Sequence, residues 1–319
     1  MNPRTVLRIK DLSLEIGNEK ILDNINLDIY ENEILSIVGV SGSGKTTLLS
    51  CMIGLFKPTK GDVLFSHKKN DQYEFKSIFK YLDYYRFHVG FSSQIPSFYN
   101  KLTIKENLMY FGKMYDIDSN ILKHRINILL ELFELKEYED KLAEELSGGM
   151  QKRLDLACAM INNPKILILD EPASELDPLL RKEIWYLIKK INQKGKTIVM
   201  SSHFIVEMEQ VANRVAILDK GKILTSGTPL ELRDEFTHYE KLIIETVPGN
   251  YELIERYITK YANIKKVIKE PHKMTIFVTN GQNAIRYIIP ILDKLNERII
   301  DLEIRKPSLE EVFESLQVK

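Results

Sequence analysis

The chain has little cysteine, no excess of either charge and no long apolar run. Its 319 residues include two cysteines, Cys51 and Cys158, too few for a disulfide framework, and the apolar helical surroundings of both predict buried filler. Lys+Arg and Asp+Glu number 45 each, so no overall positive field favours nucleic acid. The six histidines are scattered without the spacing of metal ligands, so we expect no structural metal.

Membrane-directed segments are also missing from the sequence. No apolar run approaches the roughly 18 residues that a membrane helix needs. The first residues, 1–4, lack the apolar stretch of a signal peptide. We therefore expect a cytoplasmic protein without a direct membrane span, which could reach a membrane only through a partner.

One glycine-rich segment carries the most specific signal. It fits the phosphate-binding pattern G-x-x-x-x-G-K-S/T and reads Gly39, Val40, Ser41, Gly42, Ser43, Gly44, Lys45, Thr46, Thr47. An apolar run at 34–38 predicts a buried strand before it, and 46–55 predicts a helix after it. Strand, loop and helix start direct backbone N–H groups at an anion. We expect Lys45 to reach the β- and γ-phosphates and the Thr46 hydroxyl to hold Mg²⁺.

Two adjacent carboxylates follow a second short apolar strand at 165–169. The strand would deliver Asp170 to Mg²⁺, and Glu171 could polarise a water molecule. Two carboxylates at a strand end are costly without a cation nearby, which favours a functional interpretation over a solvated turn before Pro172.

Three weaker signals stand at the ends of other elements. Ser147, with Gly148 and Gly149, is either a plain helix cap or a second phosphate clamp. Gln94 follows a strand end and could contact Mg²⁺ or the attacking water, although a lone glutamine is usually a surface amide. His203 follows the predicted strand at 197–200, where a histidine can hydrogen-bond a γ-phosphate.

The patterning predicts two domains, 1–238 and 239–319. The first is an α/β domain with an antiparallel β layer over 5–30, a mostly helical stretch over 103–146 that opens with the capping box of Thr103 and Glu106, and a hairpin over 215–224. Residues 66–88 are polar and aromatic, with a loop at 68–71. The second domain follows the order βαββαβ, which predicts a ferredoxin-like α+β fold, and a last helix capped by Ser308 and Glu311.

Taken together, these motifs resemble the ATPase subunit of an ABC transporter over residues 5 to about 235. The order is the P-loop, Gln94, Leu-Ser-Gly-Gly-Met-Gln, Leu-Asp-Glu-Pro, Leu-Asp-Pro at 176–178, and His203. The tail at 307–313 resembles the C-terminal extension of ABC-2-type exporter ATPases. The first resemblance implies a P-loop NTPase with a RecA-like core, an antiparallel β layer and a helical subdomain.

The resemblance also implies a role for each residue. Residues 39–47 would form the Walker A loop, and Asp170 the Walker B aspartate. Glu171 would be the catalytic carboxylate, Gln94 the Q-loop residue and His203 the switch histidine. The γ-phosphate of ATP held by the opposite subunit would be bound by Ser147, Gly148 and Gly149. The D-loop residue would be Asp177.

The implied activity is ATP hydrolysis with Mg²⁺ at the cytoplasmic face of the cell membrane. Two ATPase subunits, identical or closely related, would close around two ATP molecules and drive export through a separate permease. A short permease helix would dock near 94–99, where Ile95, Pro96, Phe98 and Tyr99 would supply an apolar surface. Phe98→Ala would then uncouple transport while sparing basal hydrolysis. The alternative is a soluble ABC ATPase that acts on the ribosome or on nucleic acid.

Several positions depart from the family's pattern. Ile16 stands where an aromatic residue usually stacks on adenine, a contact worth about 1–3 kcal/mol by analogy with nucleic-acid stacking, so nucleotide affinity could be weaker. Asn32 replaces a common glycine but tolerates positive φ. Ala173 and Glu175 replace the usual Thr and Gly, and Glu175 adds negative charge near the expected dimer interface. The stretch 62–94 is somewhat longer than usual.

Overall fold

The chain folds into two compact units, Met1–Thr228 and Pro229–Lys319. The computed structural model describes residues 4–69, 72–236, 239–260, 264–306 and 308–311. The sequence places the boundary at 238, outside the described residues. The helix α8, Pro229–Phe236, belongs to the second unit, where Lys306 forms an ion pair with Asp234.

An antiparallel sheet opens the first unit. Its strands are β1 Thr5–Ile16, β2 Glu19–Tyr30, β4 Lys60–Lys69 and β5 Gln72–Ser77, in the order β2-β1-β4-β5. The predicted layer over 5–30 is confirmed by the pairing of β1 with β2. The hairpin of β4 and β5 is absent from the sequence prediction. Tyr73 and Phe75 alternate with polar residues in β5, but both stay exposed and no residue of β5 is fully buried, so this short run resembles a polar and aromatic loop.

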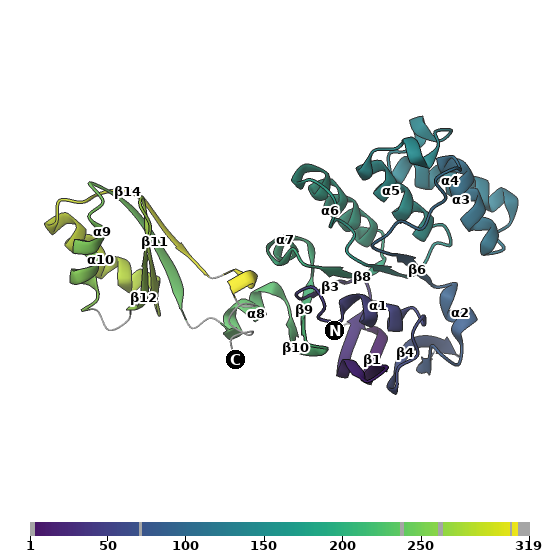
Figure 1. Ribbon diagram of the computed structural model, residues 1–319, viewed down its shortest axis with the longest axis horizontal. Helices are drawn as coiled ribbons and strands as arrows, with labels where there is room; N and C mark the ends of the chain where they lie inside the picture. The colour runs from purple at the N-terminus through teal and green to yellow at the C-terminus, as the bar shows by residue number, and fades with distance from the viewer. Residues whose placement is uncertain (1–3, 70–71, 237–238, 261–263, 307, 312–319) are drawn as a thin grey trace. The chain divides into compact units, whose positions relative to one another are not determined.

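A six-stranded sheet forms the core of the same unit (Figure 1). Its strands are β3 Ile34–Val38, β6 Val89–Ser92, β7 Ile166–Leu169, β8 Thr197–Ser202, β9 Arg214–Asp219 and β10 Lys222–Gly227. The order is β10-β9-β3-β8-β7-β6, and all neighbours are parallel except β10 with β9. Because the carboxyl ends of parallel strands share one edge, the residues after β3, β6, β7 and β8 are brought together.

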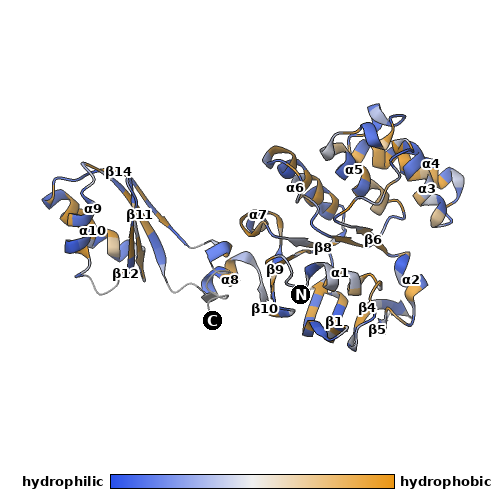
Figure 2. Cartoon of the chain, viewed as in Figure 1, coloured by the Kyte–Doolittle hydropathy of each residue, from blue (hydrophilic) through white to orange (hydrophobic). Residues whose placement is uncertain are grey.

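Helices surround this sheet and extend beyond its β6 end (Figure 1). Their bounds are α1 Lys45–Met52, α2 Leu82–Arg86, α3 Ile104–Met114, α4 Ser119–Leu132, α5 Gly148–Ala159, α6 Pro178–Gln193 and α7 Ile205–Val211, with two 3-10 turns, η1 Lys136–Tyr138 and η2 Ala143–Glu145. The capping box of Thr103 and Glu106 is confirmed at the start of α3. Hydrophobic and hydrophilic residues share most helices, as amphipathic packing requires (Figure 2).

The second unit has the predicted βαββαβ order. After α8 come β11 Glu240–Val247, α9 Tyr251–Ile258, β12 Ile264–Lys269, β13 Met274–Val278, α10 Gly281–Lys294 and β14 Arg298–Arg305. The sheet order is β12-β13-β11-β14 with every neighbour antiparallel. The strands β11 and β12 therefore run parallel with β13 between them, which is the split βαβ arrangement of a ferredoxin-like fold.

The last predicted capping box is also present. The Ser308 N–H donates to the Glu311 carboxylate at 3.1 Å, and the Glu311 N–H donates to Ser308 Oγ at 3.4 Å. Pro307, Val312 and Phe313 of the tail motif lie outside the described residues.

Glu297 gives the second unit a predictable response to acid. It accepts from the N–H groups of Gly249 and Asn250, each at 2.8 Å. Burial acts to raise the pKa of Glu297, but these donors outweigh it and the pKa is lowered. The carboxylate therefore contributes stability above the usual glutamate pKa of about 4.3, and loses it as the pH falls through the lower folded value.

Glu297→Gln should accordingly destabilise the second unit by about 1–2 kcal/mol at neutral pH, because an amide accepts these bonds more weakly than a carboxylate does. Hydrogen exchange of the amides in α9, compared between wild type and variant, measures the difference. It should shrink below about pH 4. A difference that does not change with pH would contradict the assignment.

Candidate functional site

The glycine-rich loop leaves β3 and enters α1, and it has no room for a side chain at its first residue, Gly39. Gly44 caps α1 with φ of 104°, a conformation that glycine adopts without steric cost. A Cβ on Gly39 would lie 2.3 Å from the carbonyl oxygen of Leu218 and 2.6 Å from Ser43 Oγ. The loop therefore keeps its backbone N–H groups open at a helix N-terminus, which is a binding arrangement for phosphate.

Three charged or titratable side chains from distant parts of the chain meet beside this loop. Lys45 Nζ donates to the carbonyl oxygens of Gly39 at 2.9 Å and Val40 at 3.2 Å, and lies 3.6 Å from Glu171 Oε1. The other carboxylate oxygen, Glu171 Oε2, lies 2.8 Å from His203 Nδ1. Glu171 thus bridges the loop lysine and the histidine, as an ordered carboxylate with two fixed neighbours.

Asp170 lies immediately behind Glu171 and is 2% exposed. Its Oδ1 accepts from Ser201 Oγ at 2.6 Å, and the same hydroxyl accepts from the Glu171 N–H at 2.8 Å. Glu171 has a φ of 47°, a conformation that costs a non-glycine residue energy and persists where the surroundings impose it. Ser201 therefore fixes both carboxylate residues. The sequence analysis missed it, although its place at the end of β8 was a signal.

A cavity of about 370 Å³ lies between these groups. Its lining combines the loop with three of the predicted site residues: Ser41, Gly42, Gly44, Lys45, Thr46, Thr47, Gln94, Glu171 and His203. Ile21 and Ser174 also line it, and neither was predicted. Ile16 does not line it; that residue is 51% exposed at the end of β1. The parallel sheet thus brings the loop, Gln94, Glu171 and His203 to one cavity.

The remaining predicted site residues do not line this cavity. Ser147 caps α5 by accepting from the Met150 N–H, and Gly148 and Gly149 form its first turn. Asp177 caps α6 by accepting from the N–H groups of Leu179 and Leu180. Ser147, Gly148 and Asp177 are exposed. Both caps therefore stand at the surface, where a second molecule can reach them.

The positions that depart from the family's pattern fit their surroundings. Asn32 adopts a φ of 62°, as its tolerance of positive φ predicts. Ala173 is buried at 1% exposure, so a larger residue would have to displace its neighbours. Glu175 is exposed, where a charge costs little in the single chain.

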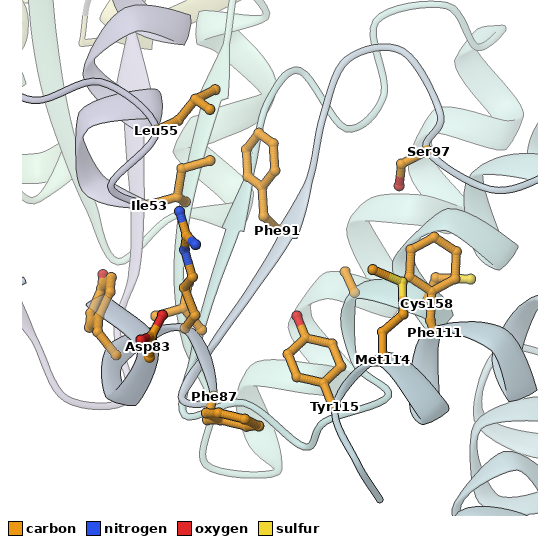
Figure 3. A pocket seen from close by; sticks show the side chains of 14 residues that line it. Ile53, Leu55, Asp83, Phe87, Phe91, Ser97, Phe111, Met114, Tyr115 and Cys158 are labelled. Carbon is orange, nitrogen blue, oxygen red and sulfur yellow. The ribbon is translucent and has the colours of Figure 1, made fainter. Parts of the chain in front are cut away.

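A second, larger cavity of about 570 Å³ lies beside β6, the edge strand of the six-stranded sheet, and we call it the groove. Figure 3 shows its side chains, which come from the end of α1, from α2 and the strand after it, and from α3 and α5. It is lined by Ile53, Leu55, Asp83, Tyr85, Arg86, Phe87, Val89, Phe91, Ser97, Phe111, Met114, Tyr115, Cys158 and Ala159. The groove is thus aromatic and aliphatic, with one acidic and one basic side chain.

The expected apolar surface at 94–99 is only partly present. Ile95 is 79% exposed and Tyr99 is 49% exposed, but Phe98 is 8% exposed and belongs to the core. The placement of Phe98 on this surface is therefore wrong, and Phe98→Ala would open a cavity inside the protein, so a loss of transport in that variant would not by itself report on docking. Ile95, Pro96, Phe98 and Tyr99 follow one another closely, and the sequence alone does not show which of these side chains points inward.

Comparison with known proteins places these features in one family. The ABC transporter family matches residues 22–174. The probable multidrug ABC transporter ATP-binding protein YbhF of Escherichia coli is 33% identical over 237 residues, 74% of this chain and 39% of YbhF, so the chain spans about two fifths of that relative. The Nod factor export ATP-binding protein I of Cupriavidus metallidurans is 28% identical over 89% of this chain and 92% of its own length.

Solved structures agree with the sequence relatives. The ATP-binding subunit of an ABC transporter matches with 26% identity and a TM-score of 0.63, over 73% of this chain and 93% of that one. A dimeric ATP-binding cassette in a post-hydrolysis state, bound to ADP and Pi, matches with 30% identity and a TM-score of 0.59, over 70% of this chain and 98% of that one. The chain belongs to the ABC transporter family, and the relatives and solved structures that it matches are ATP-binding subunits of such transporters.

Proposed function

We propose that this chain binds and hydrolyses ATP to drive export through a separate membrane subunit. The observation that carries the proposal is the convergence of Lys45, Glu171 and His203 on one cavity beside the glycine-rich loop. Export is supported by the names of the relatives reported above, one of multidrug transport and one of Nod factor export. Those names give no support to the alternative of a ribosome- or nucleic-acid-acting ATPase.

The residues around the cavity fit a nucleotide with Mg²⁺. Gly42 lines the cavity and borders open space that a side chain would occupy, and Lys45 would supply a positive charge to the phosphates. Thr46, Gln94 and Asp170 carry the oxygen atoms that Mg²⁺ prefers. When bound, Mg²⁺ would neutralise charge that develops on the transferred phosphoryl group. The exposed Ile16 would lie outside the phosphate-binding part of the site.

Glu171 would act on the attacking water, and His203 would hold Glu171 in position. The Glu171 carboxylate would accept a hydrogen bond from the attacking water and orient it, acting as a general base. His203 Nδ1 lies 2.8 Å from Glu171 Oε2 and holds that carboxylate in place. Lys45, on the other oxygen, keeps the carboxylate directed toward the loop. Both residues make Glu171 a preorganised base rather than a mobile surface group.

A second ATPase subunit would complete the site. Two helix starts lie at the surface outside the cavity, one with Ser147 and Gly148 and one with Asp177, and Gly149 follows them as a buried residue of the first turn of α5. We infer that these four residues would contact nucleotide held by a partner copy. The dimeric relative bound to ADP and Pi supports this arrangement. ATP that touches both subunits would favour the closed pair, and its hydrolysis would remove that preference. The partner would be identical or closely related.

The groove is the proposed docking site for the membrane subunit. Family membership implies a permease, and the described helices of this chain include none that is long and apolar enough to cross a membrane. The groove has aromatic and aliphatic walls with a charge of each sign at Asp83 and Arg86. These walls fit a short amphipathic cytoplasmic helix of the permease. The chain would thus sit at the cytoplasmic face of the membrane.

Charge placed in the groove tests this proposal. Phe87 is 50% exposed and lines the groove, so Phe87→Glu should disrupt docking without unfolding the chain. Tagged protein would be purified from its own membranes in mild detergent. We expect wild type to recover a membrane protein in stoichiometric amount. Phe87→Glu should recover at least about 10-fold less of it, because one interface anchor contributes about 1.4 kcal/mol or more. The isolated variant should keep its Mg²⁺-dependent hydrolysis.

Tyr186→Glu is the matched control, because Tyr186 is an exposed aromatic residue on α6 outside the groove, with 68% exposure. It should retain the membrane protein. Recovery of wild type with ribosomal subunits or nucleic acid, and with no membrane protein, would sink the transporter proposal. Equal recovery with Phe87→Glu would leave the permease but move its docking site.

A further inference from the structure

A buried ion pair on α5 forms hydrogen bonds to the segment Ser92–Ser97, which carries Gln94. Lys152 and Asp155 are 7% and 1% exposed and lie one helical turn apart. Lys152 Nζ lies 3.5 Å from Asp155 Oδ2, and donates to Ser92 Oγ at 3.2 Å and to the carbonyl oxygen of Ser93 at 3.3 Å. Ser92 Oγ in turn donates to Asp155 Oδ2.

The same carboxylate also holds the far end of the segment. Asp155 Oδ1 accepts from the Ser97 N–H at 3.1 Å and from Ser97 Oγ at 3.3 Å. One aspartate therefore binds both ends of the segment from Ser92 to Ser97, and Lys152 adds a third attachment at Ser93. Between these attachments lies Gln94, which is exposed and lines the 370 Å³ cavity beside the glycine-rich loop, which we call the phosphate cavity.

The segment touches both cavities of the first unit. Gln94 lines the phosphate cavity, whereas Ser97 lines the groove. The helix α5 begins at Gly148, directly after the Ser147 cap, and its Cys158 lines the groove as well. The ion pair thus joins α5 to a loop that runs from the phosphate cavity to the groove.

Stability alone does not account for such a pair. Taking two charges out of water is costly, and well-packed apolar residues of similar volume are often as stabilising as a buried pair. What an apolar pair cannot do is accept from Ser92 and from the Ser97 N–H at once. A buried polar network that satisfies its partners specifies one arrangement of the groups it binds.

We propose that Lys152 and Asp155 are positioning residues that hold Gln94 at the phosphate cavity and make it move with α5. The inference rests on the proposed ATPase function and deepens it, because Gln94 is there the group that contacts Mg²⁺ or the attacking water. Displacement of the groove walls would reach Gln94 through Ser97, Asp155 and Ser92. Neither residue lines the phosphate cavity itself.

The double variant Lys152→Met with Asp155→Leu separates positioning from stability. It replaces the pair with apolar side chains of similar length, so the fold should be kept, with a lower Tm than wild type because the buried Ser92 hydroxyl loses its acceptor. Loss of the grip on Gln94 should lower kcat for Mg²⁺-ATP by about 10²-fold, the cost of a catalytic group misplaced by about 1 Å. The Mg²⁺ concentration for half-maximal rate should rise, while nucleotide affinity measured without hydrolysis stays the same.

Gln94→Ala in the same background supplies the second readout. If the pair acts through Gln94, Gln94→Ala lowers kcat in wild type but adds no further loss in the double variant. Independent, multiplying losses would overturn the inference, as would a double variant as active as wild type. Arg153→Met is the matched control. Arg153 also lies on α5 but forms ion pairs with Glu134 and Glu183, away from this segment. The variant should keep the kcat and the Mg²⁺ dependence of wild type.

Ser92→Ala covers the case in which the double variant does not fold. It removes only the hydroxyl that bridges Lys152 and Asp155, and should give a smaller loss of kcat with the same non-additivity toward Gln94→Ala. Full activity of a folded Ser92→Ala protein, with additive behaviour, would count against the positioning role. Absence of hydrolysis by wild type would instead overturn the proposed ATPase function, so the two failures are distinguishable.

Discussion

Glu171→Gln should lower kcat for ATP hydrolysis by about 10²–10⁴-fold, the range for loss of a positioned general base. Glutamine has the size of glutamate and can still meet His203 Nδ1, which lies 2.8 Å from Glu171 Oε2 in wild type. What disappears is the negative charge and the basic oxygen. Nucleotide affinity should therefore persist, because the loop and Lys45 are untouched.

Two measurements check this prediction. Release of phosphate at saturating Mg²⁺-ATP gives kcat, and size-exclusion chromatography with ATP should show a longer-lived dimer than wild type, since the bridging nucleotide is no longer consumed. Glu137→Gln, an exposed carboxylate on η1, is the control and should behave as wild type. Loss of a general base should lower the rate by more than about 10-fold. A Glu171→Gln protein that keeps more than about a tenth of the wild-type rate would therefore exclude the general-base role.

Lys45→Met should weaken nucleotide binding by about 10–150-fold, corresponding to loss of a charge-assisted hydrogen bond of about 1.5–3 kcal/mol. It should also lower kcat by about 10²–10³-fold, because a preorganised positive group is lost. Lys45 is 7% exposed, and its stem can be replaced by the methionine side chain without leaving a void. The carbonyl oxygens of Gly39 and Val40 lose their Nζ donor, and Glu171 loses its nearest cation.

Equilibrium titration with a fluorescent ATP analogue measures the binding loss, and thermal unfolding shows whether the variant is folded. Lys60→Met, at an exposed lysine at the start of β4, is the control that removes a surface charge only. A folded Lys45→Met protein with wild-type affinity and wild-type kcat would show that Lys45 has no role at the phosphates. Unchanged affinity with reduced kcat would place Lys45 in the transition state alone.

Local patterns predicted most elements of this fold. The strands β3, β7 and β8 were predicted from short apolar runs, and the βαββαβ order of the second unit from alternating periodicities. The hairpin of β4 and β5 was missed because its outer strand buries no residue completely. Phe98 was assigned to the surface although it is buried, because neighbouring apolar residues give no sign of which one faces inward.

The sequence by itself determined the glycine-rich loop, the adjacent carboxylates and the helix caps, because each depends on residues a few positions apart. Only the tertiary structure decided that Glu171 lies between Lys45 and His203, that Ser201 fixes both carboxylate residues, and that Asp155 grips the Gln94 segment. These contacts join residues far apart in the chain. Their geometry follows from the order of parallel strands in one sheet and from the packing of α5 against β6, which no local spacing encodes.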